Sequence, residues 1–598
     1  MNLRPEPSAS AVAGPPPLRT VFWLALLSIL TFAAGLGLRD PWPPDEPRFA
    51  LAARDMAETG RWLFPRVGGE LYADKPPLFM WLQAVAYALT GSLRSAFLLP
   101  TILASTGVVL LVHDLGCRLW DRRTGLAAAL VLYALVQFQV QARSAQIDAT
   151  LLCLTTLSLY GLCRHLLDGP DWRWYWGGCA AAGLGVITKG VGFLPLLVLL
   201  PWTLAAWRGW NVTAARGGWR WAGGGLAFLA AVGVWLVPML VAVALSDDPA
   251  LAAYRDEILF HQTATRYADA WGHLKPPWYF LLQVIPWAWL PVSAVLPWLV
   301  PRWWRALATR DARVLLLAVW VVLVVIFFSA STGKRGVYLL PTAPAVALLA
   351  APWAVGLAAR AGVRRVLFAL IAVFTAAVGW LAIHPPRRMA EALAGAGMEQ
   401  SWVLAGGLMA VGLAVLVVFG VRRAAFGWVA LCFAVAQILG WVGHPLANPV
   451  RSGRPLVESL EARLPPDTEL GLVSWKEQFL LYLDRPVVHF GHRRAPDEAL
   501  ADAMGWLAAD PARVVLVNED PPGCVRLESA ARVGYAHRNT WYLAKLDDID
   551  PSCAGPDAGT PVTYSPPRST RRQRRACFGG AASCHARGGD SVDVTLRC

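Results

Sequence analysis

Two groups of acidic and basic residues lie between the first and second long apolar segments of the chain. The first group is Asp45 and Glu46, and the second is Asp74 and Lys75, which two prolines follow. Carboxylates can act as general bases or helix caps, and a lysine can bind phosphate. Because ionisable groups beside a membrane are costly, such a cluster indicates a functional site. We therefore place the centre of the candidate site in residues 44–77.

The residues after Asp45 have the pattern of a short helix. Pro47 suits the first helical turn, and Gly60 suits the end of the helix. Asp45 or Glu46 is expected to cap the first turn. Apolar residues recur on one face at helical spacing, namely Phe49, Ala52, Ala53 and Met56. This pattern predicts an amphipathic helix that lies on the membrane surface, with the acids at the water boundary.

Composition indicates the class of protein. Of 598 residues, 56% are hydrophobic and only 16% are charged; mean hydropathy is +0.44 and there are 30 tryptophans. Repeated apolar runs of about 20 residues are typical of an all-α polytopic membrane protein. We predict about thirteen spans, close to residues 21–38, 95–113, 126–142, 147–163, 176–188, 191–207, 222–245, 278–300, 314–329, 337–358, 366–383, 402–421 and 424–443.

Arginines predict the orientation of these spans. They are concentrated in the short loops after even-numbered spans, which the positive-inside rule places in the cytoplasm. The N-terminus, with a disordered lead over residues 1–20, is then cytoplasmic. The first outer loop is 39–94, and residues 246–277 and everything after 444 lie outside.

The composition changes after residue 444, where the membrane domain (21–444) is expected to end. Short strand-like and helix-like patterns over 445–548 predict a small outer α/β domain. Residues 549–598 resemble a disordered tail. Several cysteines fall on the outer side, where a disulfide is expected to be stable, but the sequence assigns no pairing. The net charge of +14 comes from the inner loops and the tail, so it does not indicate a nucleic-acid partner.

Further charged residues lie at predicted outer turns. Together they indicate an anion site, and phosphate is the natural anion. No nucleotide-binding fingerprint occurs in the sequence, so an outward-facing enzyme would need an activated substrate carried by the membrane. The residues concerned are Arg143 and Asp148, Lys189, His261 and Arg266, and Lys334, Arg335 and Tyr338.

These motifs, in order, carry a family resemblance. DEPRFA, YADKPPLFMWL, ARSAQIDATL, ITKG, FHQTATRY and KRGVYLLP resemble the lipid A 4-amino-4-deoxy-L-arabinose transferases and the related protein O-mannosyltransferases, which are GT-C glycosyltransferases. The resemblance covers about residues 20–450. It implies an inverting sugar transfer from a polyprenyl-phosphate donor, such as one on undecaprenyl phosphate, at the outer face of the bacterial inner membrane. The acceptor is expected to be a lipid or glycan, such as lipid A, or a protein.

The resemblance also implies roles for particular residues. Catalytic acids are expected among Asp45, Glu46 and Asp148, with Asp45 central. Lys75 and Arg266 are expected to bind the donor phosphate. The further expected substrate-binding residues are Arg48, Lys189, Lys334 and Tyr338. Relatives use the acid before the lysine and the histidine of the FH motif in a metal site, and the corresponding residues here are Asp74 and His261. A divalent metal such as zinc could bind there, but two ligands are too few to assign it.

Two features depart from the family pattern. Asp74 stands where the family usually has glutamate, and KRGVYLLP replaces a pattern with two tyrosines. Two other functions also need to be weighed. A secondary transporter has a similar number of spans, but the chain has no internal repeat and its charges collect at one face. A lipid-linked oligosaccharide polymerase or ligase would concentrate its chemistry in a large outer loop instead of the first one.

Overall fold

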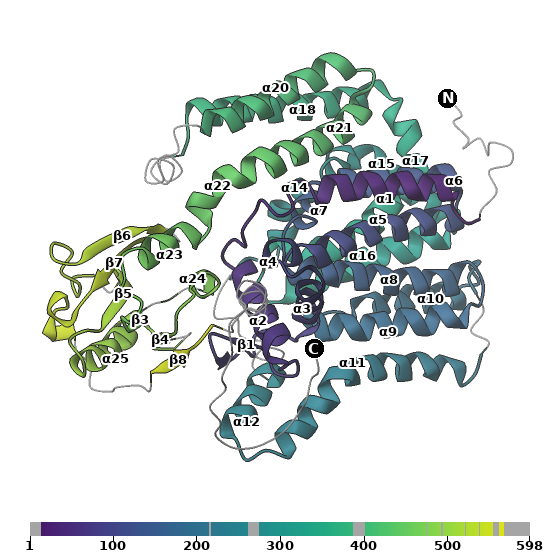
Figure 1. The fold of residues 1–598 in the computed structure, drawn as a ribbon. Helices are drawn as coiled ribbons and strands as arrows, with labels where there is room; N and C mark the ends of the chain where they lie inside the picture. The colour runs from purple at the N-terminus through teal and green to yellow at the C-terminus, as the bar shows by residue number, and fades with distance from the viewer. Residues whose placement is uncertain are drawn as a thin grey trace, which may run out of the picture.

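The structure is a computed structural model of the chain. It describes residues 14–213, 217–260, 274–386, 401–473, 475, 477–491, 494–520, 522–536, 539–553 and 561–566. The described helices form a bundle whose long axes run side by side, with a sheet domain beyond one end of the bundle (Figure 1).

Helices occur in every segment predicted to span the membrane. They are α1 (Leu18–Phe32), α5 (Leu99–Leu119), α6 (Arg122–Ala134), α7 (Val136–Gln141), α8 (Ile147–Leu167), α9 (Trp172–Lys189), η1 (Leu194–Val198) with α10 (Leu199–Trp207), α11 (Arg220–Ala244), η3 (Phe280–Val284) with α14 (Ile285–Ala288) and α15 (Val292–Ala308), α16 (Ala312–Ala330), η4 (Gly336–Thr342) with α17 (Ala343–Ala358), α18 (Ala361–Ile383), α20 (Ser401–Phe419), and α21 (Ala424–Ile438) with η5 (Leu439–Gly443) and α22 (His444–Arg451).

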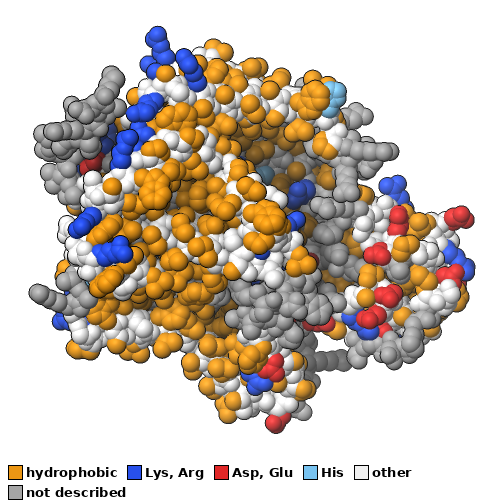
Figure 2. Space-filling view, turned by 180° about the vertical axis from the view of Figure 1, so that it is seen from behind, with side chains coloured by type: hydrophobic (Ala, Val, Ile, Leu, Met, Phe, Trp, Pro, Cys, Tyr) orange, Lys and Arg blue, Asp and Glu red, His pale blue; other side chains and the backbone are white. Residues whose placement is uncertain are grey.

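Seven helices in the described part of the chain are long and apolar enough to cross a membrane. An eighth span is formed if Phe280–Ala288 and Val292–Ala308 count as one, although they are bent by 105°. Four shorter apolar helices are Leu18–Phe32, Leu78–Thr90, Leu194–Trp207 and Val403–Phe419. The chain is therefore a mostly helical, multi-pass protein. Its bundle has a largely hydrophobic surface, with Lys and Arg along the end away from the sheet domain (Figure 2).

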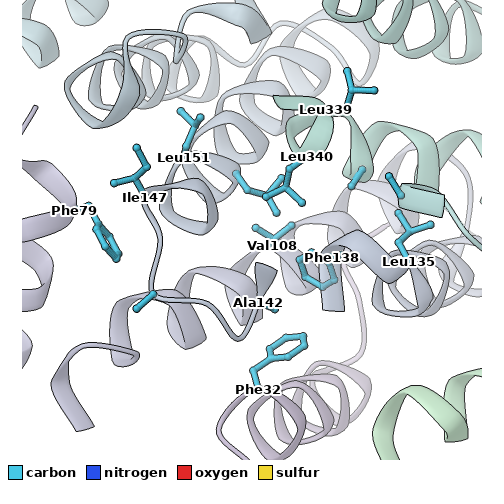
Figure 3. Packing of buried hydrophobic residues seen from close by; sticks show 14 of the residues in the cluster. Phe32, Phe79, Val108, Leu135, Phe138, Ala142, Ile147, Leu151, Leu339 and Leu340 are labelled. Carbon is cyan, nitrogen blue, oxygen red and sulfur yellow. The ribbon is translucent and has the colours of Figure 1, made fainter. Parts of the chain in front are cut away.

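The interior of the bundle is closely packed by side chains from distant parts of the sequence. Phe32 and Phe138 meet edge to face, with ring centroids 5.7 Å apart. Figure 3 shows Val108, Leu151 and Leu340 in the same core. The packing joins α1, α5, α7, α8 and η4, so the turns at their ends are held at defined positions.

The first outer segment is folded into the protein. It contains α2 (Glu46–Thr59), a hairpin of β1 (Arg66–Val67) and β2 (Glu70–Leu71), α3 (Leu78–Thr90) and α4 (Leu93–Ala96). α2 ends at Gly60 in the left-handed conformation, as predicted. The prediction of a membrane-surface helix is wrong, because its apolar residues are almost completely buried against other parts of the protein. Neither Asp45 nor Glu46 caps the helix through its side chain.

The C-terminal part contains a six-stranded sheet in the order β6-β7-β5-β3-β4-β8. Its strands are β3 (Leu470–Leu472), β4 (Val487–His489), β5 (Val514–Asn518), β6 (Ala531–Ala536), β7 (Asn539–Ala544) and β8 (Val562–Tyr564). β3 runs parallel to β4 and β5, and the other neighbouring strands are antiparallel.

Short helices accompany the sheet: α23 (Arg454–Glu461), α24 (Glu477–Leu480), α25 (Pro496–Ala508), η6 (Leu546–Asp548) and η7 (Pro551–Cys553). A disulfide joins Cys524 to Cys553. β8 lies in the segment predicted to be a disordered tail, so the sheet extends farther than predicted. Its pairing with β4 is a long-range contact that local composition does not reveal.

Candidate active site

Asp45 lies at the start of α2 with an accessible carboxylate. Its Oδ2 atom is 3.9 Å from Nη2 of Arg335, and the two side chains are 23% and 39% exposed. The pair is loose, and the carboxylate makes no capping hydrogen bond to α2. Asp45 is therefore held beside a cation and can still be reached by a substrate.

Glu46 is placed very differently from its neighbour. Its side chain is 4% exposed, and both carboxylate oxygens accept hydrogen bonds from Nη2 of Arg39 at 2.5 Å. The backbone N–H groups of Trp42 and Ala145 also donate to it, each at 2.9 Å. These bonds tie the first outer segment to the turn before α8. The geometry favours a structural role for Glu46 over the catalytic role expected from the sequence.

Arg48 connects three segments. Its Nε donates to Oε1 of Glu477 at 2.6 Å, and its Nη1 is 3.9 Å from Oδ2 of Asp74. Its guanidinium also lies 5.8 Å from the ring centroid of Tyr72. Burial by itself lowers the pKa of Arg48, but the charges of Glu477 and Tyr72 and the hydrogen bonds to both together outweigh it and raise the pKa above its usual value. Arg48 therefore stays charged and is engaged by protein carboxylates.

Lys75 follows Asp74 at the end of the β-hairpin segment. Its Nζ donates to the backbone carbonyl of Asp74 at 2.7 Å. The other two residues expected around it, His261 and Arg266, lie outside the described residues. Within the described residues no group of three or more His, Cys, Asp and Glu side chains is placed to bind a metal. The Asp74 carboxylate faces a guanidinium, which disfavours a cation there, so we derive no step through zinc.

Asp148 and Lys189 form a second charged pair. Asp148 is in the first turn of α8 and Lys189 is the last residue of α9. Nζ of Lys189 is 2.5 Å from Oδ1 of Asp148, and it lies 5.1 Å from the ring centroid of Tyr338. The three residues expected from separate motifs are thus brought together. Lys189 neutralises Asp148, so neither is an unpaired group in this arrangement.

The two cations of the KRGVYLLP motif point to different partners. Lys334 is 4% exposed and donates to the carbonyls of Lys275, at 3.0 Å, and Ser331. Its bonds hold the turn before η4 together, which favours a structural role over the expected substrate contact. Arg335 instead extends to Asp45. Because Lys334 and Arg335 are adjacent cations, the sequence alone does not show which of them faces the site.

These contacts assemble one site from distant segments. Asp45 contacts Arg335, which is three residues before Tyr338, and Tyr338 lies beside Lys189 and Asp148. Two contributors are not among the catalytic or substrate-binding residues expected from the family resemblance, although the sequence places Arg335 in the anion site. Arg335 is within a recognised motif, so the motif points to it, whereas Glu477 lies in the sheet domain and has no sequence signal that links it to the site.

Comparisons with known proteins identify the family and the fold of the chain. Residues 74–237 match the family described as dolichyl-phosphate-mannose-protein mannosyltransferase. Undecaprenyl phosphate-alpha-4-amino-4-deoxy-L-arabinose arabinosyl transferase 2 of Sodalis glossinidius is 30% identical over 435 residues, which cover 70% of this chain and 75% of that protein. The chain belongs to this arabinosyl transferase family. The resemblance inferred from the motifs is thereby confirmed.

Other members of the arabinosyl transferase family match a shorter region. The protein from Pseudomonas aeruginosa PAO1 is 34% identical over 337 residues. The match covers 54% of this chain, and the chain spans 58% of that relative's length. The crystal structure of ArnT from Cupriavidus metallidurans bound to undecaprenyl phosphate has a TM-score of 0.70 at 22% identity, covering 90% of this chain and 99% of that one. This likeness shows the GT-C fold, and the family indicates a multi-pass protein of the bacterial inner membrane.

Proposed function

We propose that this chain is a glycosyltransferase that moves a sugar from a polyprenyl-phosphate donor to an envelope acceptor. The names of its relatives favour 4-amino-4-deoxy-L-arabinose carried on undecaprenyl phosphate. The acceptor that best fits this donor is lipid A. The structural observation that carries the proposal is the accessible Asp45 carboxylate beside Arg335, at the bundle end where the motif residues meet.

The proposed step is an inverting displacement at the anomeric carbon of the sugar. An acceptor oxygen forms a bond to that carbon while the bond to the donor phosphate oxygen breaks, and the phosphate leaves with the electron pair. Lys75 and Arg266 stabilise the charge that develops on the phosphate. Asp45 takes the proton when the acceptor is a hydroxyl group. If the acceptor is an ionised phosphate, Asp45 orients it instead.

The remaining motif residues have supporting roles in this proposal. Asp148 is the second acid; Lys189 pairs with it, and the ring of Tyr338 lies beside Lys189. Arg48 pairs with Asp74 and so helps to position the segment that carries Lys75. We expect Glu46 and Lys334 to maintain the outer turns, because their polar atoms are bonded within the protein.

The function is tested by mass spectrometry of lipid A, other envelope lipids and exported proteins from cells with and without the chain. We expect the mass of one aminoarabinose residue on lipid A only in cells that contain it. A second measurement uses washed membranes supplied with the donor. If the chain were a transporter, the masses of the lipids and proteins in these membranes would stay unchanged. An oligosaccharide ligase would add a multi-sugar mass.

The proposed topology has about thirteen spans, a cytoplasmic N-terminus and an outer sheet domain that begins near residue 445. Two observations support it. Lys and Arg collect along the bundle end opposite the sheet domain (Figure 2). The Cys524–Cys553 disulfide lies in the sheet domain, and disulfides persist in the periplasm.

We expect a reporter fused after Arg423 to be cytoplasmic and one fused after Asp550 to be periplasmic. Alkaline phosphatase, which is active only outside, and a fluorescent protein that folds only inside would report the two locations. Reversed signals would place Asp45 and Lys75 on the cytoplasmic side and contradict the proposed orientation.

A further inference from the structure

We propose that Glu477, from the C-terminal sheet domain, is a positioning residue of the active site that acts through Arg48. The inference rests on the proposed function where its test measures the rate of sugar transfer. It makes the sheet domain a part of the transfer site in addition to any role in contacting the acceptor.

The contact itself is short and largely buried. Glu477 is the first residue of α24, and its side chain is 9% exposed. Its Oε1 accepts from Nε of Arg48 at 2.6 Å. Arg48 is one helical turn after Asp45 on α2, and its other end faces Asp74, the residue before Lys75. One guanidinium therefore links the sheet domain to Asp74, the residue before the proposed phosphate-binding lysine.

The neighbouring contacts hold α24 against α2. Nη1 of Arg54 donates to the carbonyl of Leu481 and its Nη2 to that of Leu480, both at 2.9 Å. Nη2 of Arg54 also donates to the Tyr564 hydroxyl at 2.9 Å. These bonds keep the two helices together without Glu477. Removing the charge of Glu477 should therefore disturb Arg48 more than it disturbs the docking of the domain.

The hairpin of the first outer segment is held in the same way. Nε2 of His489 donates to the carbonyl of Gly68 at 2.7 Å. Gly68 has a φ of +64°, and a Cβ there would be 2.8 Å from the Trp475 ring, so the hairpin and the sheet domain fit closely. The segment from Arg66 to Lys75 is thus braced at one end by His489 and at the other by Arg48.

Within the described part of the chain, loss of the Glu477 carboxylate leaves Asp74 as the ionic partner of the Arg48 guanidinium. The guanidinium would then shift toward Asp74 and Asp45, which displaces the phosphate-binding lysine and masks the acid. We expect Glu477→Gln to weaken the binding of undecaprenyl phosphate and to lower kcat/KM for transfer, each by about tenfold.

The experiment measures undecaprenyl phosphate affinity in detergent, transfer kinetics and thermal unfolding on the full chain. Glu461→Gln is the matched control, because Glu461 pairs with Arg485 at 2.8 Å within the same domain and away from the site. We expect this control to keep wild-type affinity and kcat/KM. Arg48→Lys, which keeps the charge but not the two-ended contact, serves as a second variant if Glu477→Gln folds poorly.

A double variant tests the route of the effect. If Glu477 acts through Arg48, adding Glu477→Gln to Arg48→Gln should cause no further loss of affinity. Additive losses would overturn the inference, and so would wild-type affinity in Glu477→Gln. Because affinity for the lipid phosphate is measured without a sugar donor, it tests Glu477 even if the chain fails to transfer sugar, a result that would count only against the proposed function.

Discussion

Asp45→Asn is expected to reduce sugar transfer by at least about 100-fold, the contribution typical of a general base. The substitution preserves the size of the side chain and removes its charge. Because the Asp45 side chain makes no capping hydrogen bond to α2, the helix loses nothing from the change. Expression and membrane insertion should remain normal. The measurement is the transfer rate of purified protein with a polyprenyl-phosphate sugar and lipid A.

Glu46→Gln is the matched control for this prediction. It changes the adjacent carboxylate in the same way, but Glu46 is buried and paired with Arg39. Breaking a buried ion pair typically costs about 3–5 kcal/mol, so we expect a lower unfolding temperature. Activity lost in Asp45→Asn together with the same loss of stability would point to a structural role. Near-normal transfer by Asp45→Asn would remove it from the catalytic step.

Lys75→Ala and Arg266→Ala are each expected to weaken the binding of undecaprenyl phosphate by about tenfold or more. Hydrogen bonds to charged groups contribute about 1.5–3 kcal/mol each, which corresponds to that change. The Lys75 side chain is partly buried beside two prolines that restrict its backbone, and its Nζ donates to the carbonyl of Asp74, so the ammonium group is held at a defined position. Binding measured in detergent by titration with the lipid decides the prediction.

Arg255→Ala provides the control for this pair of variants. Arg255 is on α12 (Pro249–Asp256), in the same outer loop as Arg266, and pairs with the exposed Asp256 at 2.7 Å. Removing an exposed cation should leave the affinity unchanged. If all three variants bind the lipid phosphate as the wild type does, the donor assignment is wrong. If all three lose affinity equally, the outer face attracts the lipid through its overall charge and not through a specific clamp.

Several features could be predicted because they depend on local sequence. Apolar runs placed a helix in every predicted segment, since a helix in lipid satisfies its own backbone hydrogen bonds. Gly60 ended α2 because only a residue tolerant of positive φ fits there. The motifs indicated the family that the Sodalis glossinidius relative establishes. The bend of 105° after Ala288 was not predicted, because an apolar run does not reveal a break in its helix.

The sequence by itself determined the composition of the membrane helices, the motifs and the identity of the charged groups that the site could contain. Only the tertiary structure decided which of them are available. Asp45 and Glu46 are adjacent acids, yet one faces Arg335 and the other is buried against Arg39. Glu477 meets Arg48 across more than four hundred residues of chain. Burial and ion pairing depend on contacts between distant segments, so the folded chain, and not residue type or spacing, sets the role of each charge.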